Sequence, residues 1–145
     1  MSIWNNTPDI EQLNARMQTG LSRHLGIRVK SHDAQSLSTV MAISGDIRQP
    51  EGLLAGGASA ALAEITAGIA GGHCIDSSQR VVVGQELNIS HLRSARDGYV
   101  TATAHPLRLG RRSQVWHIEI HGDDGQLVAV ARVTNAVLER GRSPT

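Results

Sequence analysis

The segment 52–75 carries a single charged side chain, the carboxylate of Glu64. Small or apolar residues surround it on every side of a helical projection, which is typical of a helix buried in a protein core. A membrane span is a poor alternative, because alanine and glycine are weakly hydrophobic and a carboxylate at mid-membrane is costly. Buried glutamates are rare unless they are paired or functional. Glu64 could simply pair with an arginine or a backbone group, but its isolation favours a catalytic acid–base role.

Two consecutive glycines, Gly56 and Gly57, stand where a polar loop enters this predicted helix. The first N–H groups of a helix have no partner within it, so they can point at a developing oxyanion. A tight turn would also explain a double glycine. Its position about two turns before Glu64 favours the catalytic interpretation.

Two further patterns could support other chemistry. Ser59 resembles the serine of a nucleophile elbow, but Ala61 replaces the final glycine and the chain lacks strand–helix alternation. His117, Glu119 and His121 share one face of a predicted strand and could bind a metal. A solvated strand face explains them more simply, and no second ligand cluster supports a metal. We therefore predict no serine triad, no metal and no cofactor.

Positive charge gathers around two segments that connect predicted strands. Such charge is usually a solvated surface, but arginine forks are also suited to the phosphates of a nucleotide-bearing substrate. The residues concerned are Arg93, Arg96, Arg108, Arg111 and Arg112.

Length and composition indicate one globular domain over residues 1–145. A formal net charge of +1, two tryptophans and one tyrosine give no reason to expect nucleic-acid binding. The single cysteine, Cys74, excludes an internal disulfide and is consistent with a reducing compartment. No N-terminal segment has the pattern of a signal peptide, so a cytoplasmic protein without membrane contact is expected.

The order of predicted elements defines the fold class. Thr7 and Pro8 begin a short helix at about residues 8–19, and Gly20 ends it. The central helix covers about residues 57–74. Predicted strands are residues 27–30, 37–43, 81–91, 99–104, 116–121 and 127–138. The expected fold is therefore α+β: an antiparallel sheet of about six strands wrapped around one long helix, the hotdog architecture.

Four motifs together resemble the PaaI-like hotdog thioesterases over nearly the whole chain. They lie at residues 49–54, 56–64, 86–93 and 106–110. The resemblance is strongest to the proofreading thioesterase of enterobactin synthesis and the dihydroxynaphthoyl-CoA thioesterase of menaquinone synthesis. It implies hydrolysis of an acyl or aroyl thioester of coenzyme A or of a carrier protein.

The same resemblance implies roles for individual residues. Glu64 would be the general base or nucleophile, the Gly56 N–H would polarise the thioester oxygen, and Gln49 would position water or substrate. His91 would line the acyl pocket. Apart from the resemblance, we also expect Gly57 and the arginines Arg93, Arg108, Arg111 and Arg112 to contact substrate. The site would lie between the subunits of a homodimer, with dimers pairing into a homotetramer, so that Glu64 faces Gln49 and Gly56 of another chain.

Two positions depart from the family pattern. Ala55 stands where the family has a histidine before the double glycine, and alanine cannot donate a hydrogen bond to a thioester oxygen. The chain is therefore expected to turn over its substrate slowly. Gly68, one turn after Glu64, stands where many relatives carry serine or threonine, which removes one polar contact to substrate.

Two other functions are compatible with the sequence. A hotdog hydratase or dehydratase would need an acid–base partner near Glu64, and the sequence indicates no histidine there. A non-enzymatic module that binds acyl-CoA becomes a stronger alternative because of Ala55.

Overall fold

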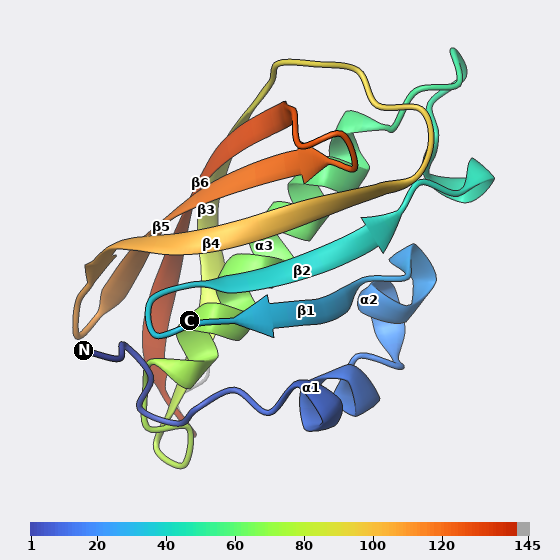
Figure 1. The fold of residues 1–145 in the computed structure, drawn as a ribbon. Helices are drawn as coiled ribbons and strands as arrows, with labels where there is room; N and C mark the ends of the chain where they lie inside the picture. The colour runs from blue at the N-terminus through green and yellow to red at the C-terminus, as the bar shows by residue number, and fades with distance from the viewer. Residues whose placement is uncertain (142–145) are drawn as a thin grey trace.

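The computed structural model describes residues 1–141, in which an antiparallel sheet wraps around one long helix (Figure 1). The predicted α+β hotdog fold is confirmed. The elements follow in the order α1 (Ile10–Arg16), α2 (Gly20–Leu25), β1 (Arg28–His32), β2 (Leu37–Ala42), the short 3-10 helix η1 (Gly45–Ile47), α3 (Gly56–His73), β3 (Arg80–His91), β4 (Tyr99–Leu109), β5 (Ser113–Gly122) and β6 (Leu127–Glu139).

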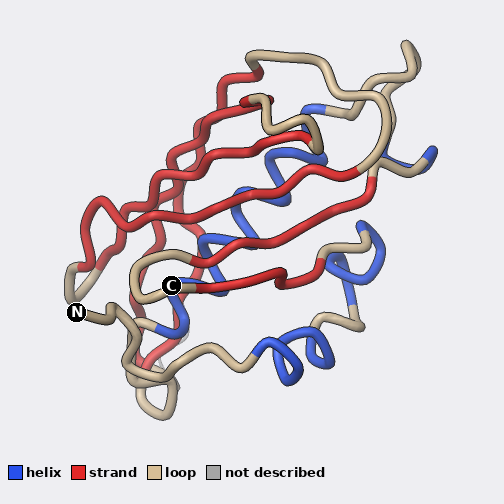
Figure 2. The backbone as a smooth tube through the Cα atoms, viewed as in Figure 1, coloured by secondary structure: helices blue, strands red, loops and turns tan. Residues whose placement is uncertain are grey.

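The six strands pair in the order β1-β2-β4-β5-β6-β3, and every neighbouring pair is antiparallel. The helix α3 lies along one face of this sheet (Figure 2). The two edge strands are β1 and β3. The twelve residues of β3 pair only with β6, and none of their side chains is fully buried. Such a long open edge invites pairing with another strand.

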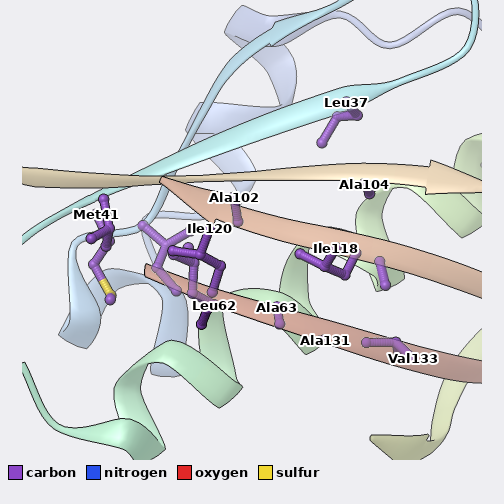
Figure 3. Close-up of a cluster of buried hydrophobic side chains, with 14 of the residues drawn as sticks. Leu37, Met41, Leu62, Ala63, Ala102, Ala104, Ile118, Ile120, Ala131 and Val133 are labelled. Atoms are coloured by element: carbon purple, nitrogen blue, oxygen red, sulfur yellow. The ribbon is translucent and has the colours of Figure 1, made fainter. Parts of the chain in front are cut away.

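The core lies between α3 and the sheet. A stripe of small side chains on α3, including Ala63, Ala67 and Ala70, is inaccessible to solvent and lets the sheet approach closely. Leu62 fills the space at one end of this stripe, and burial of such a side chain contributes about 1.5–3 kcal/mol. The sheet residues that face the stripe are drawn in Figure 3 and include Ala102, Ala104, Ile118, Ile120, Ala131 and Val133.

Buried amides from the sheet fix α3 at its C-terminal half. Gln114 Nε2 donates to the carbonyl of Gly71 at 3.1 Å, and Asn135 Nδ2 donates to a carbonyl one turn earlier at 3.0 Å. A Cβ on Gly71 would collide with the Gln114 side chain and lie 2.9 Å from Asn135 Nδ2. Gly71 is therefore the glycine that permits this close approach, whereas a Cβ on Gly68 or Gly72 would contact nothing within 4 Å.

The N-terminal region differs from the predicted single helix at residues 8–19. Asp9, rather than Thr7, caps α1 by accepting the N–H of Gln12 at 3.1 Å. Gly20 does not end the helical region but begins α2, a helix that the sequence pattern did not reveal. The reason is physical: α2 has only six residues, Leu21 is exposed and Leu25 alone packs partly against the core, which is too little for a helical pattern. The helix ends at Gly26 in a left-handed conformation.

The strand bounds also differ at one hairpin. The chain remains in β4 as far as Leu109, beyond the predicted end at residue 104, and β5 begins at Ser113. The pairing of β4 with β2 ends at Ala104, whereas its pairing with β5 continues to Leu109 with a register shift between Pro106 and Arg108.

None of the helices within residues 1–141 is long and apolar enough to cross a membrane.

Candidate active site

Glu64 lies on the side of α3 that the sheet does not cover, and its side chain is exposed in the single chain. The prediction of a buried carboxylate is therefore wrong for one chain taken alone. The sheet covers only the stripe that contains Leu62, Ala63 and Ala67. Because the opposite side of the helix is equally rich in alanine and glycine, sequence alone could not distinguish the covered side from the open one.

The Glu64 carboxylate lies against the backbone of β3 at Gly84. A Cβ at Gly84 would collide with a Glu64 carboxylate oxygen, and the register between β3 and β6 shifts between Gly84 and Glu86. Gly84 is not among the site residues predicted from the sequence, although a lone glycine in a strand pattern can signal a bulge or a close approach. Glu64, Ala60 and Leu87 line a cavity of about 280 Å³ at this position.

A second cavity, of about 320 Å³, contains other predicted site residues. Gln49, Gly56, His91 and Arg93 line it. Within residues 1–141, the N–H groups of Gly56 and of Gly57 beside it donate to no acceptor, so both are available to a ligand oxygen.

His91 and Gln49 fit closely around this second cavity. A Cβ at Gly56 would lie 2.8 Å from His91 Nε2, so any larger residue at position 56 would displace the exposed imidazole from its place over the start of α3. The side-chain oxygen of Gln49 accepts the N–H of Glu51, which leaves the side-chain NH₂ group free to donate.

The two cavities are separate within one chain. Gly56 and Glu64 are eight residues apart on α3, which corresponds to about 12 Å along the helix axis. No described cavity contains both residues. A thioester carbonyl therefore cannot contact the Gly56 N–H and the Glu64 carboxylate of the same chain at once.

Ala55 is the N-cap residue of α3 and makes no side-chain capping hydrogen bond. Its N–H donates to the carbonyl of Ile47 at 2.9 Å, and its carbonyl accepts the N–H of Ala58 at 3.0 Å. These bonds fix the backbone just before Gly56. Ser59, by contrast, is only 2% exposed, which agrees with a helix-start role rather than a nucleophile.

The predicted phosphate-binding arginines lie at two ends of the sheet. Arg93 follows β3, near the start of α3, whereas Arg111 and Arg112 lie in the turn between β4 and β5 at the opposite end (Figure 1). Arg108 is near this turn, at the end of β4. All four side chains are exposed. One chain therefore does not bring Arg93 together with the other three.

The structure gives little support to a metal site at His117, Glu119 and His121 or to a reactive cysteine. His117 Nε2 lies 3.3 Å from Glu119 Oε1, and His121 Nε2 lies 3.8 Å from Glu119 Oε2. Within residues 1–141, no group of three or more such side chains is arranged to hold a metal ion. Burial raises the pKa of the Cys74 thiol to about 12, so this cysteine is not a thiolate nucleophile near neutral pH.

A sheet wrapped around a central helix defines the hotdog class of proteins, and here a carboxylate lies on the open side of that helix. The sequence model of the thioesterase superfamily matches residues 51–129. The chain is 41% identical to the 1,4-dihydroxy-2-naphthoyl-CoA hydrolase of Escherichia coli, over 94% of this chain and 99% of that protein. It is 39% identical to the proofreading thioesterase EntH of Cronobacter turicensis, over 94% and 98% of the two chains.

Solved structures give the same result. A mutant of thioesterase PA1618 from Pseudomonas aeruginosa superposes with a TM-score of 0.93 at 45% identity, over 95% of this chain and 99% of that one. The thioesterase HI1161 from Haemophilus influenzae superposes with a TM-score of 0.93 at 36% identity, over 99% of each chain. The protein belongs to the thioesterase superfamily. The family resemblance and the enzyme class predicted from the sequence are thus confirmed.

Proposed function

We propose that this protein hydrolyses an acyl or aroyl thioester of coenzyme A, or of a carrier protein, to a free acid and a thiol. The observation that supports the proposal is that each chain contains two separate half-sites. One has a lone carboxylate on the open side of α3, and the other has free N–H donors at the start of α3. Hydrolysis needs both, because a base or nucleophile must attack while donors stabilise the oxyanion. A cytoplasmic location is part of the proposal.

A homodimer would complete the site. Two copies could pair antiparallel along the edge strand β3, related by a two-fold axis between Leu87 and Asn88. If this axis also passes close to Ala60, which is midway between Gly56 and Glu64 on α3, it brings Gly56 of each chain to Glu64 of the other. Ala60 and Leu87 already line the same cavity, so one axis can pass near both. Each site would then take Glu64 from one chain and Gly56 from the other. This pairing would also bury the open edge of β3 and the uncovered side of α3.

In this arrangement the thioester oxygen accepts the N–H of Gly56, and Gln49 orients the water or the substrate. Glu64 of the other chain either removes a proton from the attacking water or attacks the carbonyl carbon itself. In the first route the tetrahedral intermediate collapses, the carbon–sulfur bond breaks, and the thiolate takes up a proton. In the second route the Glu64 carboxylate adds to the carbonyl carbon, the carbon–sulfur bond breaks, and the expelled thiolate takes up a proton. Water then hydrolyses the acyl–Glu64 anhydride to the free acid and restores the Glu64 carboxylate.

Ala55 lowers the rate in this proposal without abolishing binding. The N-cap position keeps the backbone around Gly56 in place, but the side chain supplies no hydrogen-bond donor. A non-enzymatic acyl-CoA-binding protein is the second candidate, and the missing donor at Ala55 is the observation that favours it. Tight binding of acyl-CoA without thiol release, even after Ala55→His, would support that alternative.

A subunit-mixing experiment tests the proposed function. In an Ala55→His background, Glu64→Ala and Gln49→Ala chains are prepared alone and as a mixed dimer purified through two different tags. Each variant alone should release thiol slowly from acyl-CoA. The mixed dimer should recover about half of the parent kcat, because one of its two sites keeps both residues. A mixed dimer no faster than the two variants would refute a site shared between chains.

A further inference from the structure

The largest of the described cavities has no role in the catalytic proposal. It has a volume of about 470 Å³ and lies between α1, the C-terminal half of α3 and the first residues of β3. Its apolar walls include Leu13, Met17 and Ile69. This volume is within the range of small-molecule sites in proteins.

Two glycines that line this cavity lie beyond Glu64 on α3, and Glu64 itself lines a different cavity. Gly68 and Gly72 follow Glu64 at intervals of four residues, so the three lie on one side of the helix. Neither glycine has a positive φ, and a Cβ at either position would contact nothing within 4 Å. Neither the backbone nor the packing of this chain therefore requires glycine there. What the two glycines provide is open space beside the helix.

The distances suit an acyl group. Gly68 and Gly72 lie about 6 Å and 12 Å beyond Glu64 along the helix axis. An acyl chain whose carbonyl is held at Glu64 would reach the far wall of the cavity with roughly six to eight carbons. The pantetheine arm of coenzyme A would leave the carbonyl in another direction.

The far end of the cavity is positively charged. Arg16 of α1, Arg80 at the start of β3 and Arg140 after β6 line it, together with His73. Among residues 1–141, no aspartate or glutamate lines the cavity and no salt bridge involves these arginines. One acidic group acts on Arg80: Asp76 lies between two residues that line the cavity, and hydrogen bonds from Ser78, together with the charge of Arg80, lower its pKa. Arg140 Nε donates to the carbonyl of Ser77 at 2.6 Å, which fixes its guanidinium at the rim.

We propose that this cavity binds the acyl group of the substrate and selects acyl groups that end in a carboxylate, as in thioesters of dicarboxylic acids. The inference rests on the proposed thioester hydrolysis and specifies its substrate class. The apolar walls would hold the methylene chain, and the arginines would form charge-assisted hydrogen bonds with the distal carboxylate. The same arginines could instead hold the phosphates of coenzyme A, so the test must separate these two anions.

The experiment compares suberoyl-CoA with octanoyl-CoA, which differ in the distal carboxylate, in the Ala55→His background. The expected preference for suberoyl-CoA in kcat/KM is roughly 10-fold or more. The double variant Arg16→Gln/Arg80→Gln should abolish this preference. Arg132→Gln is the matched control, because Arg132 is exposed on β6 between two residues that face the core. It should leave the preference unchanged.

The pantetheine thioesters of the same two acids, which lack the nucleotide phosphates, separate the anions. With the pantetheine thioesters, the parent should still prefer the suberoyl substrate over the octanoyl substrate, and the double variant should still lack this preference. If the double variant instead raises KM equally for both CoA thioesters and for neither pantetheine thioester, the arginines bind coenzyme A and the inference is overturned. Gly72→Leu should lower kcat/KM for the eight-carbon substrates but not for acetyl-CoA. No change with Gly72→Leu would mean that the acyl group does not enter this cavity.

A binding measurement keeps this inference separate from the proposed function. Isothermal titration calorimetry of the unaltered chain should give tighter binding for suberoyl-CoA than for octanoyl-CoA, even if hydrolysis is absent. Failure of all thioester hydrolysis would overturn the proposed function alone. Hydrolysis with equal affinity for the two thioesters would overturn the carboxylate specificity alone.

Discussion

The carboxylate of Glu64 occupies the space that a side chain at Gly84 would need. This contact joins the central helix to the edge strand at the point where the β3–β6 register shifts. It holds the carboxylate beside β3, on the side of the molecule where a second chain would pair. Gly84 is thus a positioning residue for Glu64 in the proposed mechanism.

Gly84→Ala should therefore reduce activity more than stability. The new methyl group would push the Glu64 carboxylate away, and misplacement of a reacting group by about 1 Å can cost on the order of 10²-fold in rate. In the Ala55→His background we expect kcat to fall at least roughly 10-fold. The control is Gly45→Ala, because a Cβ at Gly45 would contact nothing within 4 Å. Equal kcat values for the two alanine variants would remove Gly84 from the mechanism.

The arginines at the ends of the sheet give a second prediction. If Arg93, Arg108, Arg111 or Arg112 binds the phosphates of coenzyme A, replacement by glutamine should raise KM for a CoA thioester. KM for the matching pantetheine thioester should stay constant, because that substrate has no such phosphates. The expected rise is roughly 10-fold for a partly buried charge-assisted contact and smaller for an exposed one. A parallel rise for both substrates would indicate a general structural effect.

The turn between β1 and β2 gives a prediction about pH. Asp33 accepts the N–H groups of Gln35 and Ser36, each at 2.7 Å, and the Ser36 hydroxyl at 2.9 Å. The N–H of Gln35, followed by the Ser36 hydroxyl, lowers the pKa of the Asp33 carboxyl below its ordinary value of 3.8. Asp33 therefore stabilises the fold above pH 3.8, and this contribution is lost as the pH falls through the lowered pKa of the folded state.

Asp33→Asn should cost about 1 kcal/mol of unfolding free energy at pH 7, as for a lost charged acceptor at an exposed turn. Urea unfolding at pH 7 and at a pH below the folded-state pKa measures the difference. At the lower pH the variant and the parent should be equally stable. A constant difference at both pH values would show that the carboxylate charge is not the cause.

The sequence was sufficient to predict the fold because each level of its pattern agreed. Alternating apolar residues marked the strands, and one long segment rich in alanine marked the helix around which they wrap. The short helix α2 was missed because it has six residues and none of them is fully buried, so the pattern is too short to mark a helix. The extension of β4 through Pro106 depends on a register shift that only the pairing with β5 reveals.

The site was less predictable, because it depends on which side of α3 the sheet covers. Both sides of α3 have similar composition, so the sequence did not show that Glu64 is exposed in one chain. The four-residue spacing of Gly68 and Gly72 predicts close packing at these two glycines, and within one chain this prediction is wrong. Only the structure distinguishes Gly71, which accommodates the Gln114 side chain, from the two glycines that border open space.

The last prediction concerns Ala55, the residue before the two free N–H groups of α3. Its backbone has φ −65° and ψ 134°, a conformation open to any residue, and its side chain makes no capping bond. A histidine can therefore be introduced without a change in the main chain. Because one lost donor at an oxyanion costs about 2.7–4 kcal/mol, Ala55→His should raise kcat by roughly 10²–10³-fold.

Substrate binding should change little, because the acyl cavity and the arginines lie elsewhere on the chain, so KM should remain within a few-fold. Steady-state thiol release from acyl-CoA measures both constants. The matched control is Ala55→Phe, which adds a ring without a donor and should not raise kcat. A histidine variant no faster than the alanine parent would show that position 55 has no part in the chemistry of this chain, although Gln49, Gly56 and Glu64 are all present.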